Sequence, residues 1–201
     1  DEEMCGMNCP EECSCKRAFF NCSYADLFNR SYILIGMGAH ARHILATHTY
    51  LSELARVFDY PYLFHLNLSH NDIKTIKPRL FTNTKNLLSV DLSHNTLTHL
   101  SRDTFFNLER LQHLNLEGNP SLTRIESGAF VGLSALPYLQ LNGHNFGILL
   151  DAQFLGLSAL KRLHLKRANI HTIRHHAFYH LPQLKELDIS ENDIMDFDKT
   201  I

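Results

Sequence analysis

The sequence predicts a solenoid of stacked strand-and-turn units behind a cysteine-rich N-terminal segment, and two observations carry this prediction. The chain of 201 residues repeats itself with a period of about 24 residues from position 62 onward. All five of its cysteines lie at or before position 22. A fixed period in the twenties is typical of stacked structural units, because one unit alone cannot bury its apolar face.

The clustered cysteines are compatible with either a disulfide knot in a secreted protein or a zinc site in a cytosolic one. Three Asn-x-Ser triplets favour the secreted alternative, and they make candidate N-glycosylation sites of Asn21, Asn29 and Asn67. Because the number of cysteines is odd, one of them has no partner within the chain. We therefore expect an oxidising, extracellular location.

The composition excludes several other classes of protein. A hydrophobic content of 44% and a formal net charge of −2 indicate a globular chain, not a disordered or nucleic-acid-binding tail. No run approaches the roughly 18 apolar residues of a membrane helix, so we expect no membrane contact from this segment itself. No signal sequence precedes Asp1 and the chain stops inside a repeat, so we expect a processed chain or a fragment.

Residues 31–61 form an irregular first repeat, since they do not follow the register of the later units. We expect a first strand at about residues 33–37, then an irregular connection and a short helix at about residues 51–58. Residues 62–201 contain six regular units, of which the last is incomplete.

Each regular unit begins with alternating apolar residues, as in Leu63, Leu66 and Leu68, which indicates a short strand with these side chains facing inward. Phenylalanines recur at one phase later in each unit. We expect them to form an aromatic spine on the opposite, convex flank, and they are Phe81, Phe105, Phe130, Phe154 and Phe178.

The pattern LxxLxLxxNxLxxLxxxxFxxLxx of residues 62–201 resembles the extracellular class of leucine-rich repeats. This resemblance implies an α/β, right-handed solenoid with a parallel concave sheet, an irregular or 3-10 convex side and a disulfide-bonded N-terminal cap. It also implies that the recurrent asparagines are buried and bind the backbone of neighbouring turns. These are Asn71, Asn95, Asn119 and Asn192.

This asparagine ladder is interrupted in units four and five, where His144 and Ala168 take the equivalent position. We expect the next residues, Asn145 and Asn169, to substitute for them through a shifted backbone.

Four cysteines with the spacing C-x3-C-x-C-x6-C, in residues 9–30, resemble the N-terminal cap of extracellular leucine-rich-repeat proteins. The resemblance implies bridges from Cys9 to Cys15 and from Cys13 to Cys22, which leaves Cys5 as the spare. Asp1-Glu2-x-x-Cys5 resembles the end of a low-density-lipoprotein-receptor class A module. We therefore interpret residues 1–8 as the tail of such a module, the alternative being a linker with an unpaired thiol.

The outward strand positions of units three to six are the candidate ligand-binding residues, because they vary while the leucine frame stays constant. We expect a protein or peptide to dock on this concave surface around Tyr138, Arg162 and His164, since aromatic and arginine side chains are the usual anchors of interfaces. The full candidate set is His113, Asn115, Tyr138, Gln140, Lys161, Arg162, His164, Lys166, Glu186 and Asp188. Lys161, Arg162, Lys166 and Arg167 make a local basic band beside the acidic pair Glu186 and Asp188.

Motifs of enzymes and of cofactor sites are absent. The chain has no G-x-S-x-G and no glycine-rich phosphate loop, so we expect neither an enzyme nor a cofactor. The stretch HTIRHHAFYH offers histidines to a zinc ion, but no acidic third ligand accompanies them. We favour solvent-exposed histidines and expect no metal; they are His171, His175, His176 and His180.

The module tail, cap and repeats together resemble the ectodomain of a leucine-rich-repeat G-protein-coupled receptor of the relaxin-receptor type. That resemblance implies a peptide hormone as ligand, bound partly through acidic pairs of the kind formed by Glu186 and Asp188. The alternative is a secreted or membrane-tethered adhesion or matrix protein. Neither interpretation involves nucleic acid as a partner.

Overall fold

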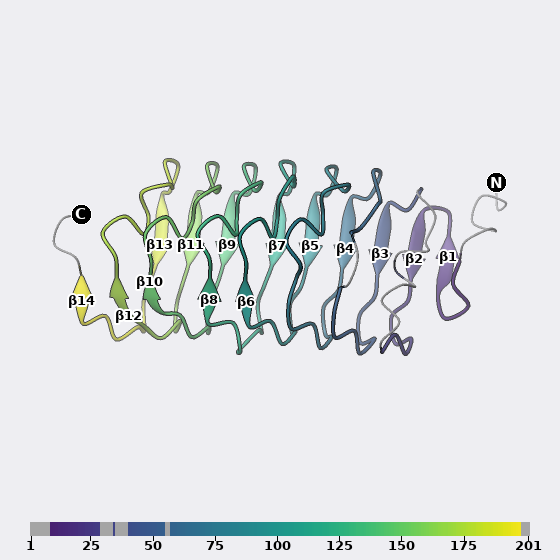
Figure 1. The fold of residues 1–201 in the computed structure, drawn as a ribbon, viewed down its shortest axis with the longest axis horizontal. Coiled ribbons are helices and arrows are strands. Elements are labelled where there is room, and N and C mark those ends of the chain that lie inside the picture. Colours follow the sequence, from purple (N-terminus) through teal and green to yellow (C-terminus); the bar gives the residue numbers. More distant parts are fainter. Residues whose placement is uncertain (1–8, 29–33, 35–39, 55–56, 198–201) are drawn as a thin grey trace.

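The computed structural model describes residues 9–28, 34, 40–54 and 57–197, and these form a solenoid of stacked turns (Figure 1). The predicted leucine-rich-repeat architecture with a disulfide-bonded cap is thus confirmed. The described residues contain no α-helix, and the connections between strands are built from turns and short strands.

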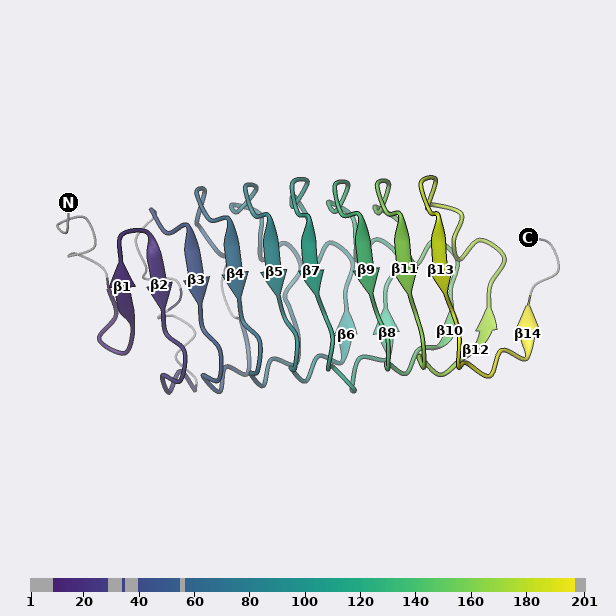
Figure 2. The same cartoon turned by 180° about the vertical axis from the view of Figure 1, so that it is seen from behind.

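The main sheet runs the length of the molecule and carries one strand for each turn (Figure 2). A six-stranded sheet contains, in order, β1 (Ser14–Lys16), β2 (Phe19–Asn21), β3 (His43–Leu45), β4 (His65–Asn67), β5 (Ser89–Asp91) and β7 (His113–Asn115). A three-stranded sheet continues it beside β7, with β9 (Tyr138–Gln140), β11 (Arg162–His164) and β13 (Glu186–Asp188). Among the described strands of these two sheets, only the β1–β2 pair is antiparallel.

The strands β4, β5, β7, β9 and β11 bury their middle residue and turn the first and third outward, as period-two geometry requires, while Leu187, the middle residue of the last strand β13, is 38% exposed. Leu66, Leu139 and Leu163 are buried middle residues, for example. We call the outward side of β1 to β5, β7, β9, β11 and β13, the nine strands of these two sheets, the sheet face.

A second set of short parallel strands lies on the other side of the solenoid, as Figures 1 and 2 show from opposite directions. One pair joins β6 (His99–Leu100) to β8 (Arg124–Ile125), and a triplet joins β10 (Gly147–Leu149), β12 (Ile170–Ile173) and β14 (Asp196–Phe197). These strands belong to the connections that were expected to be irregular or 3-10.

The core consists of leucines from every turn and of the predicted aromatic spine. Phe81, Phe105, Phe130 and Phe154 have no exposed surface, and their rings stack with centroids 6.1–6.4 Å apart. Phe58 extends the stack at the N-terminal end, 5.9 Å from Phe81. Because each ring covers the next, the spine stabilises contacts between turns and not within one turn.

The expectation for residues 31–61 is partly wrong. A strand of this segment is β3, which lies in register between β2 and β4. Leu54 forms a bridge with Ile76, and the described residues between 51 and 58 are not helical. Of the first strand expected at residues 33–37, only Leu34 falls within the described residues.

The structure contains both disulfides of the cap, Cys9–Cys15 and Cys13–Cys22. They hold the antiparallel β1–β2 hairpin, which covers the first edge of the sheet and leaves β2 to pair with β3. Cys5 and the rest of residues 1–8 lie outside the described residues, as does Asn29.

The asparagine ladder is present at Asn71, Asn95 and Asn119, all of which are buried. Asn95 illustrates its geometry: Oδ1 accepts the Ile73 N–H at 3.0 Å, and Nδ2 donates to backbone carbonyls of its own turn and of the preceding one. Asn192 makes the corresponding bonds to the fifth turn.

At the two interruptions the backbone itself supplies the missing bonds. The Leu122 N–H donates to the Asn119 carbonyl, and the Phe146 N–H donates to the Ala168 carbonyl, so neither needs a side-chain acceptor. The expectation that Asn145 and Asn169 replace the ladder is wrong, because both are exposed and bond to each other at 2.6 Å.

His144 is buried at the first interruption, with 3% of its surface exposed. The carbonyls of Leu116, Leu141 and Asn142 approach its ring, but neither ring nitrogen makes a hydrogen bond of ordinary geometry. Burial lowers the pKa of His144, an effect that these carbonyls only partly oppose.

The residue before each ladder position has a positive φ, which lets the chain turn sharply away from the sheet. In the N-terminal turns this residue is aromatic, and the rings stack with centroids 4.4–4.8 Å apart in the order Tyr24, His48, His70 and His94. Gly118 ends the stack, because a Cβ there would lie 2.5 Å from His94 Nδ1. Partial desolvation of the stacked ring, and after it the charges of His94 and His48, lower the pKa of His70.

Candidate ligand-binding face

Five of the six outward residues of β9, β11 and β13 form one network through hydrogen bonds and a cation–π contact. Register pairing places Tyr138, Arg162 and Glu186 in one row and Gln140, His164 and Asp188 in the next. The Tyr138 hydroxyl donates to Gln140 Oε1 at 2.6 Å and lies 3.1 Å from His164 Nδ1. His164 Nε2 in turn lies 2.7 Å from Glu186 Oε1. Three strands therefore hold these side chains in fixed positions relative to one another.

Arg162 lies over the ring of Tyr138, with its guanidinium carbon 5.1 Å from the ring centroid. This cation–π contact restrains an arginine that is otherwise exposed. Burial raises the pKa of Tyr138, so its hydroxyl stays protonated and remains a donor at physiological pH. The pair presents a flat aromatic and guanidinium surface, the combination that anchors many interfaces.

The basic band is less basic than the sequence suggests. Lys166 Nζ lies 2.8 Å from a Glu191 oxygen, and the Arg167 guanidinium binds the other oxygen of that carboxylate. These two cations hold the pKa of Glu191 below its usual range. Sequence reasoning missed Glu191 because it lies in the turn after β13, outside the alternating positions.

The acidic residues of this face are Glu186 and Asp188 of β13. Hydrogen bonds from Ser190 lower the pKa of Asp188, with smaller contributions from His164 and Lys166. Glu186 is exposed and meets His164 from the neighbouring strand. The face therefore offers a carboxylate edge at β13 next to the arginine of β11.

The remaining candidates lie beside this network. His113 and Asn115 are exposed on β7, and Lys161 and Lys166 flank β11 on either side. Eight of the ten predicted residues thus share the sheet face, and the two lysines border it.

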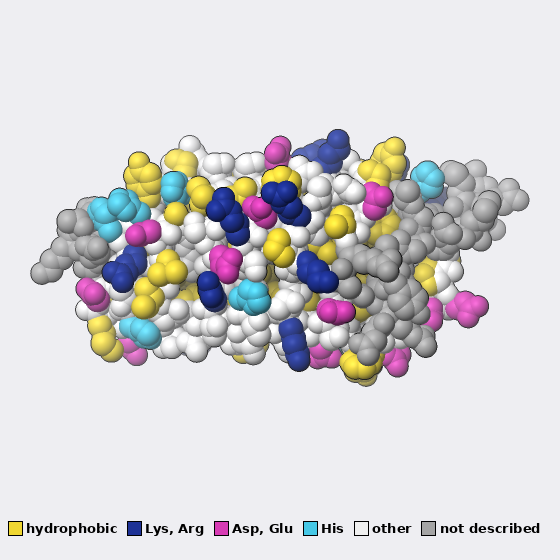
Figure 3. Space-filling view, viewed as in Figure 1, with side chains coloured by type: hydrophobic (Ala, Val, Ile, Leu, Met, Phe, Trp, Pro, Cys, Tyr) yellow, Lys and Arg dark blue, Asp and Glu magenta, His cyan; other side chains and the backbone are white. Residues whose placement is uncertain are grey.

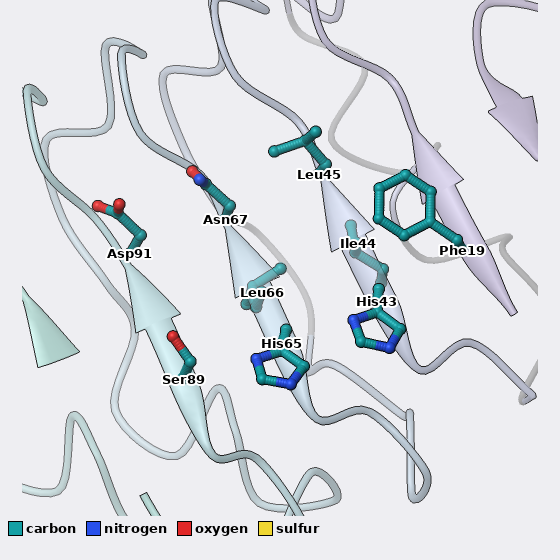
Figure 4. A pocket seen from close by; sticks show the side chains of 9 residues that line it. All are labelled: Phe19, His43, Ile44, Leu45, His65, Leu66, Asn67, Ser89 and Asp91. Carbon is teal, nitrogen blue, oxygen red and sulfur yellow. The ribbon is translucent and has the colours of Figure 1, made fainter. Parts of the chain in front are cut away.

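The N-terminal part of the sheet face has a shallow hollow that sequence reasoning missed (Figure 4). The rings of His43 and His65 stack there at 4.8 Å, and Phe19 lies 5.9 Å from His43. Burial lowers the pKa of His43, and the positive charges of His65 and Arg42 lower it further. The hollow was missed because the strand containing His43 was not recognised; its lining comprises Phe19, His43, Ile44, Leu45, His65, Leu66, Asn67, Ser89 and Asp91.

The opposite side of the solenoid shows lysines, arginines and carboxylates interspersed, without a field of one sign over its described part (Figure 3). The rings of His175, His176, Tyr179 and His180 contact one another edge to face. Among the described residues, no group of three or more His, Cys, Asp or Glu side chains could hold a metal ion. The described part of the chain also lacks a helix long and apolar enough to span a membrane.

Comparison with known proteins agrees with this architecture. The family model described as "Leucine rich repeat" matches residues 61–120, 89–146 and 144–194. Toll-like receptor 3 of Homo sapiens is 34% identical over 143 residues, which cover 67% of this chain and 15% of that protein. The thyrotropin receptor of Sus scrofa is 35% identical over 75 residues, which cover 37% of this chain and 10% of that protein.

Among solved structures, the TLR13–ssRNA13 complex superposes with a TM-score of 0.69 at 25% identity, covering 80% of this chain and 23% of that chain. The chain thus spans only a small part of the length of these relatives. Its repeats, its capped parallel sheet and the match of the family model over residues 61–194 show that the chain belongs to the leucine-rich-repeat family.

Proposed function

We propose that this chain is the ligand-recognition part of an extracellular receptor and that it binds a peptide or protein on the sheet face from β7 to β13. The observation that carries the proposal is the network of Tyr138, Arg162, His164 and Glu186, whose side chains are held in place before any ligand arrives. Preorganised side chains lose little conformational entropy on binding.

Charge supports a polypeptide ligand more than a nucleic acid. A phosphate backbone requires several unpaired cations, whereas here Lys166 and Arg167 are paired with Glu191. Glu186 and Asp188 add negative charge at the edge of the same surface. A polypeptide can match an aromatic, a guanidinium and carboxylates side by side.

Substitutions of the network with matched controls test the location of the site. Tyr138→Ala and Arg162→Ala should each weaken binding by about 30-fold, equivalent to about 2 kcal/mol for a central anchor. Tyr179→Ala and Arg174→Ala change the same residue types on the connections, away from the sheet face, and should leave affinity unaltered.

The measurement is biolayer interferometry of the secreted chain against a panel of secreted peptides, with single-stranded RNA as a competing class of ligand. Equal affinities for the wild type, Tyr138→Ala and Arg162→Ala would place the site elsewhere. Binding of RNA alone, with loss on Arg162→Ala, would replace a polypeptide by a nucleic acid as the ligand.

Membership of the relaxin-receptor type of G-protein-coupled receptor is the finer part of the proposal. It is supported by Asp1-Glu2-x-x-Cys5, which resembles the end of a class A module, and by the similarity to the thyrotropin receptor. The full-length transcript tests it: a seven-helix segment downstream supports the receptor, and a glycine-rich or stalk-like tail supports an adhesion or matrix protein.

A further inference from the structure

Two of the Asn-x-Ser triplets lie near each other on the N-terminal part of the sheet face. Asn21 is the last residue of β2 and Asn67 is the last residue of β4. Leu45 of β3 lies between them and is in register with both. Because neighbouring strands are separated by about 4.8 Å, the two asparagines stand about 10 Å apart in one row.

Both asparagines can carry a sugar without losing a contact. The N–H of Ser23 donates to Asn21 Oδ1 at 2.9 Å, and the N–H and hydroxyl of Ser69 donate to Asn67 Oδ1 at 2.9 and 2.8 Å. Within the described structure, Nδ2 of Asn21 and of Asn67, the atom that bears a glycan, donates to no acceptor. In Asn71, by contrast, Nδ2 bonds three backbone carbonyls.

The hollow of Figure 4 is lined by residues of β2, β3, β4 and β5, the strands that carry or adjoin these two positions. Asn67 is part of its lining and points to the same side of β4 as His65. Phe19 is 41% exposed and, with the stacked rings of His43 and His65, offers aromatic surface. A pyranose ring has an apolar face of C–H groups, which suits such a surface.

We propose that Asn21 and Asn67 carry N-linked glycans whose first sugars pack into this hollow and cover the sheet face of β2 to β4. The proposal goes beyond the proposed function and is independent of it. If this proposal and the proposed function both hold, the glycans leave only the later strands of the sheet face accessible to a ligand, and these strands carry the polar network.

The chain contains its own matched control. Strand β7 repeats the tripeptide of β4, since His113-Leu114-Asn115 follows the pattern of His65-Leu66-Asn67. The N–H of Glu117 donates to Asn115 Oδ1 at 3.1 Å, in the same turn that Ser69 makes with Asn67. Because Glu117 replaces the serine of the triplet, Asn115 is not a glycosylation site.

The experiment uses the chain secreted from mammalian cells. Release of glycans by peptide-N-glycosidase in heavy-oxygen water converts each occupied asparagine to labelled aspartate, which mass spectrometry locates. We expect occupancy at Asn21 and Asn67 and none at Asn115. An unoccupied Asn21 or Asn67 in the secreted protein would overturn the assignment of that site.

Histidine labelling with diethylpyrocarbonate tests the packing. Removing the glycans should raise the labelling of His43 and His65 several-fold and leave His113 unchanged. Asn67→Asp provides a reference that never carried a sugar, and Asn115→Asp measures the effect of a new carboxylate alone on the adjacent imidazole. Labelling of His43 and His65 that does not change on deglycosylation would refute the packing.

A transplanted site completes the test. Glu117→Ser creates an Asn-x-Ser triplet at Asn115, and the resulting glycan should lower the labelling of His113 several-fold. A glycosylated Asn115 that leaves His113 as reactive as before would refute the idea that a sugar at this strand position covers its neighbour.

Discussion

Replacing Asn95 by alanine tests whether the buried ladder stabilises the solenoid. Asn95 is 3% exposed; its Oδ1 accepts the Ile73 N–H at 3.0 Å, and its Nδ2 donates to the Leu68 and Leu92 carbonyls, both at 3.0 Å, and to the Ser93 carbonyl at 3.2 Å. An alanine can make none of these bonds. The variant therefore removes one acceptor and one amide donor group from a site without access to water.

The four backbone groups that Asn95 bonds are not affected equally by its removal. The Leu68 carbonyl keeps a donor from Asn71 at 3.1 Å, the Leu92 carbonyl keeps one from Asn119 at 3.0 Å, and the Ser93 carbonyl keeps the His70 N–H at 3.0 Å. Only the Ile73 N–H loses its partner. A buried N–H without a partner costs about 1–3 kcal/mol, and each lost bond to a carbonyl that keeps another donor costs less than the usual ~0.5–1.5 kcal/mol, so we expect about 3 kcal/mol in all. For a chain of this length, that loss lowers Tm by about 6–12 °C.

Urea unfolding followed by circular dichroism measures this difference directly. The control is Asn83→Ala, because Asn83 is exposed and makes no hydrogen bond within the described structure. If Asn95→Ala and Asn83→Ala agree within about 0.5 kcal/mol, the range of ordinary surface substitutions, then the ladder does not contribute to stability.

Three further predictions concern the core, a turn and acid sensitivity. Phe130→Ala should cost about 3–5 kcal/mol in urea unfolding, since its ring is fully buried in the spine, whereas the exposed Phe28→Ala should cost little. Gly156→Ala should lower Tm clearly, because its φ is +108° and a Cβ would lie 2.4 Å from the Phe130 carbonyl oxygen; Gly143→Ala, with free space around it, should lower Tm less. Because burial lowers the pKa of His144, the unfolded chain binds its proton more readily, and stability should fall as pH drops below about 6.5. His144→Asn should make unfolding measured between pH 7.5 and 5 less dependent on pH, and an unchanged slope would contradict this origin.

The regular units could be predicted from the sequence because the residues that form the core are also the ones that recur. A leucine at each inward position and a phenylalanine in each connection leave a periodic trace. The turn that contains β3 has the same inward positions, but Ala41 and Ala46 take the place of leucines and Thr49 that of the asparagine. Since alanine and threonine occur everywhere in proteins, the pattern of this turn could not be recognised.

The candidate site was predictable to a similar extent and for a similar reason. Alternation along a strand determines which side chains face outward, so the rows containing Tyr138 and His164 could be identified. Contacts made by turn residues could not be predicted in this way. The direction of the Glu191 side chain, for example, depends on a backbone with a φ of 54°. The hollow beside Phe19 required the alignment of the cap with β3, which no periodicity reveals.

The shared carbonyls of the ladder have a mechanical consequence. The Leu68 oxygen accepts hydrogen bonds from Asn71 and Asn95, and the Leu92 oxygen accepts them from Asn95 and Asn119. Each of these carbonyls therefore links the asparagines of two successive turns. A pulling force that peels one of these turns away must break bonds of the next at the same moment. At His144 this link is missing, because the Leu116 carbonyl accepts from Asn119 and neither ring nitrogen of His144 adds a hydrogen bond. Stretched between its ends in an optical trap, the molecule should yield first at this seam and release the N-terminal turns as one block.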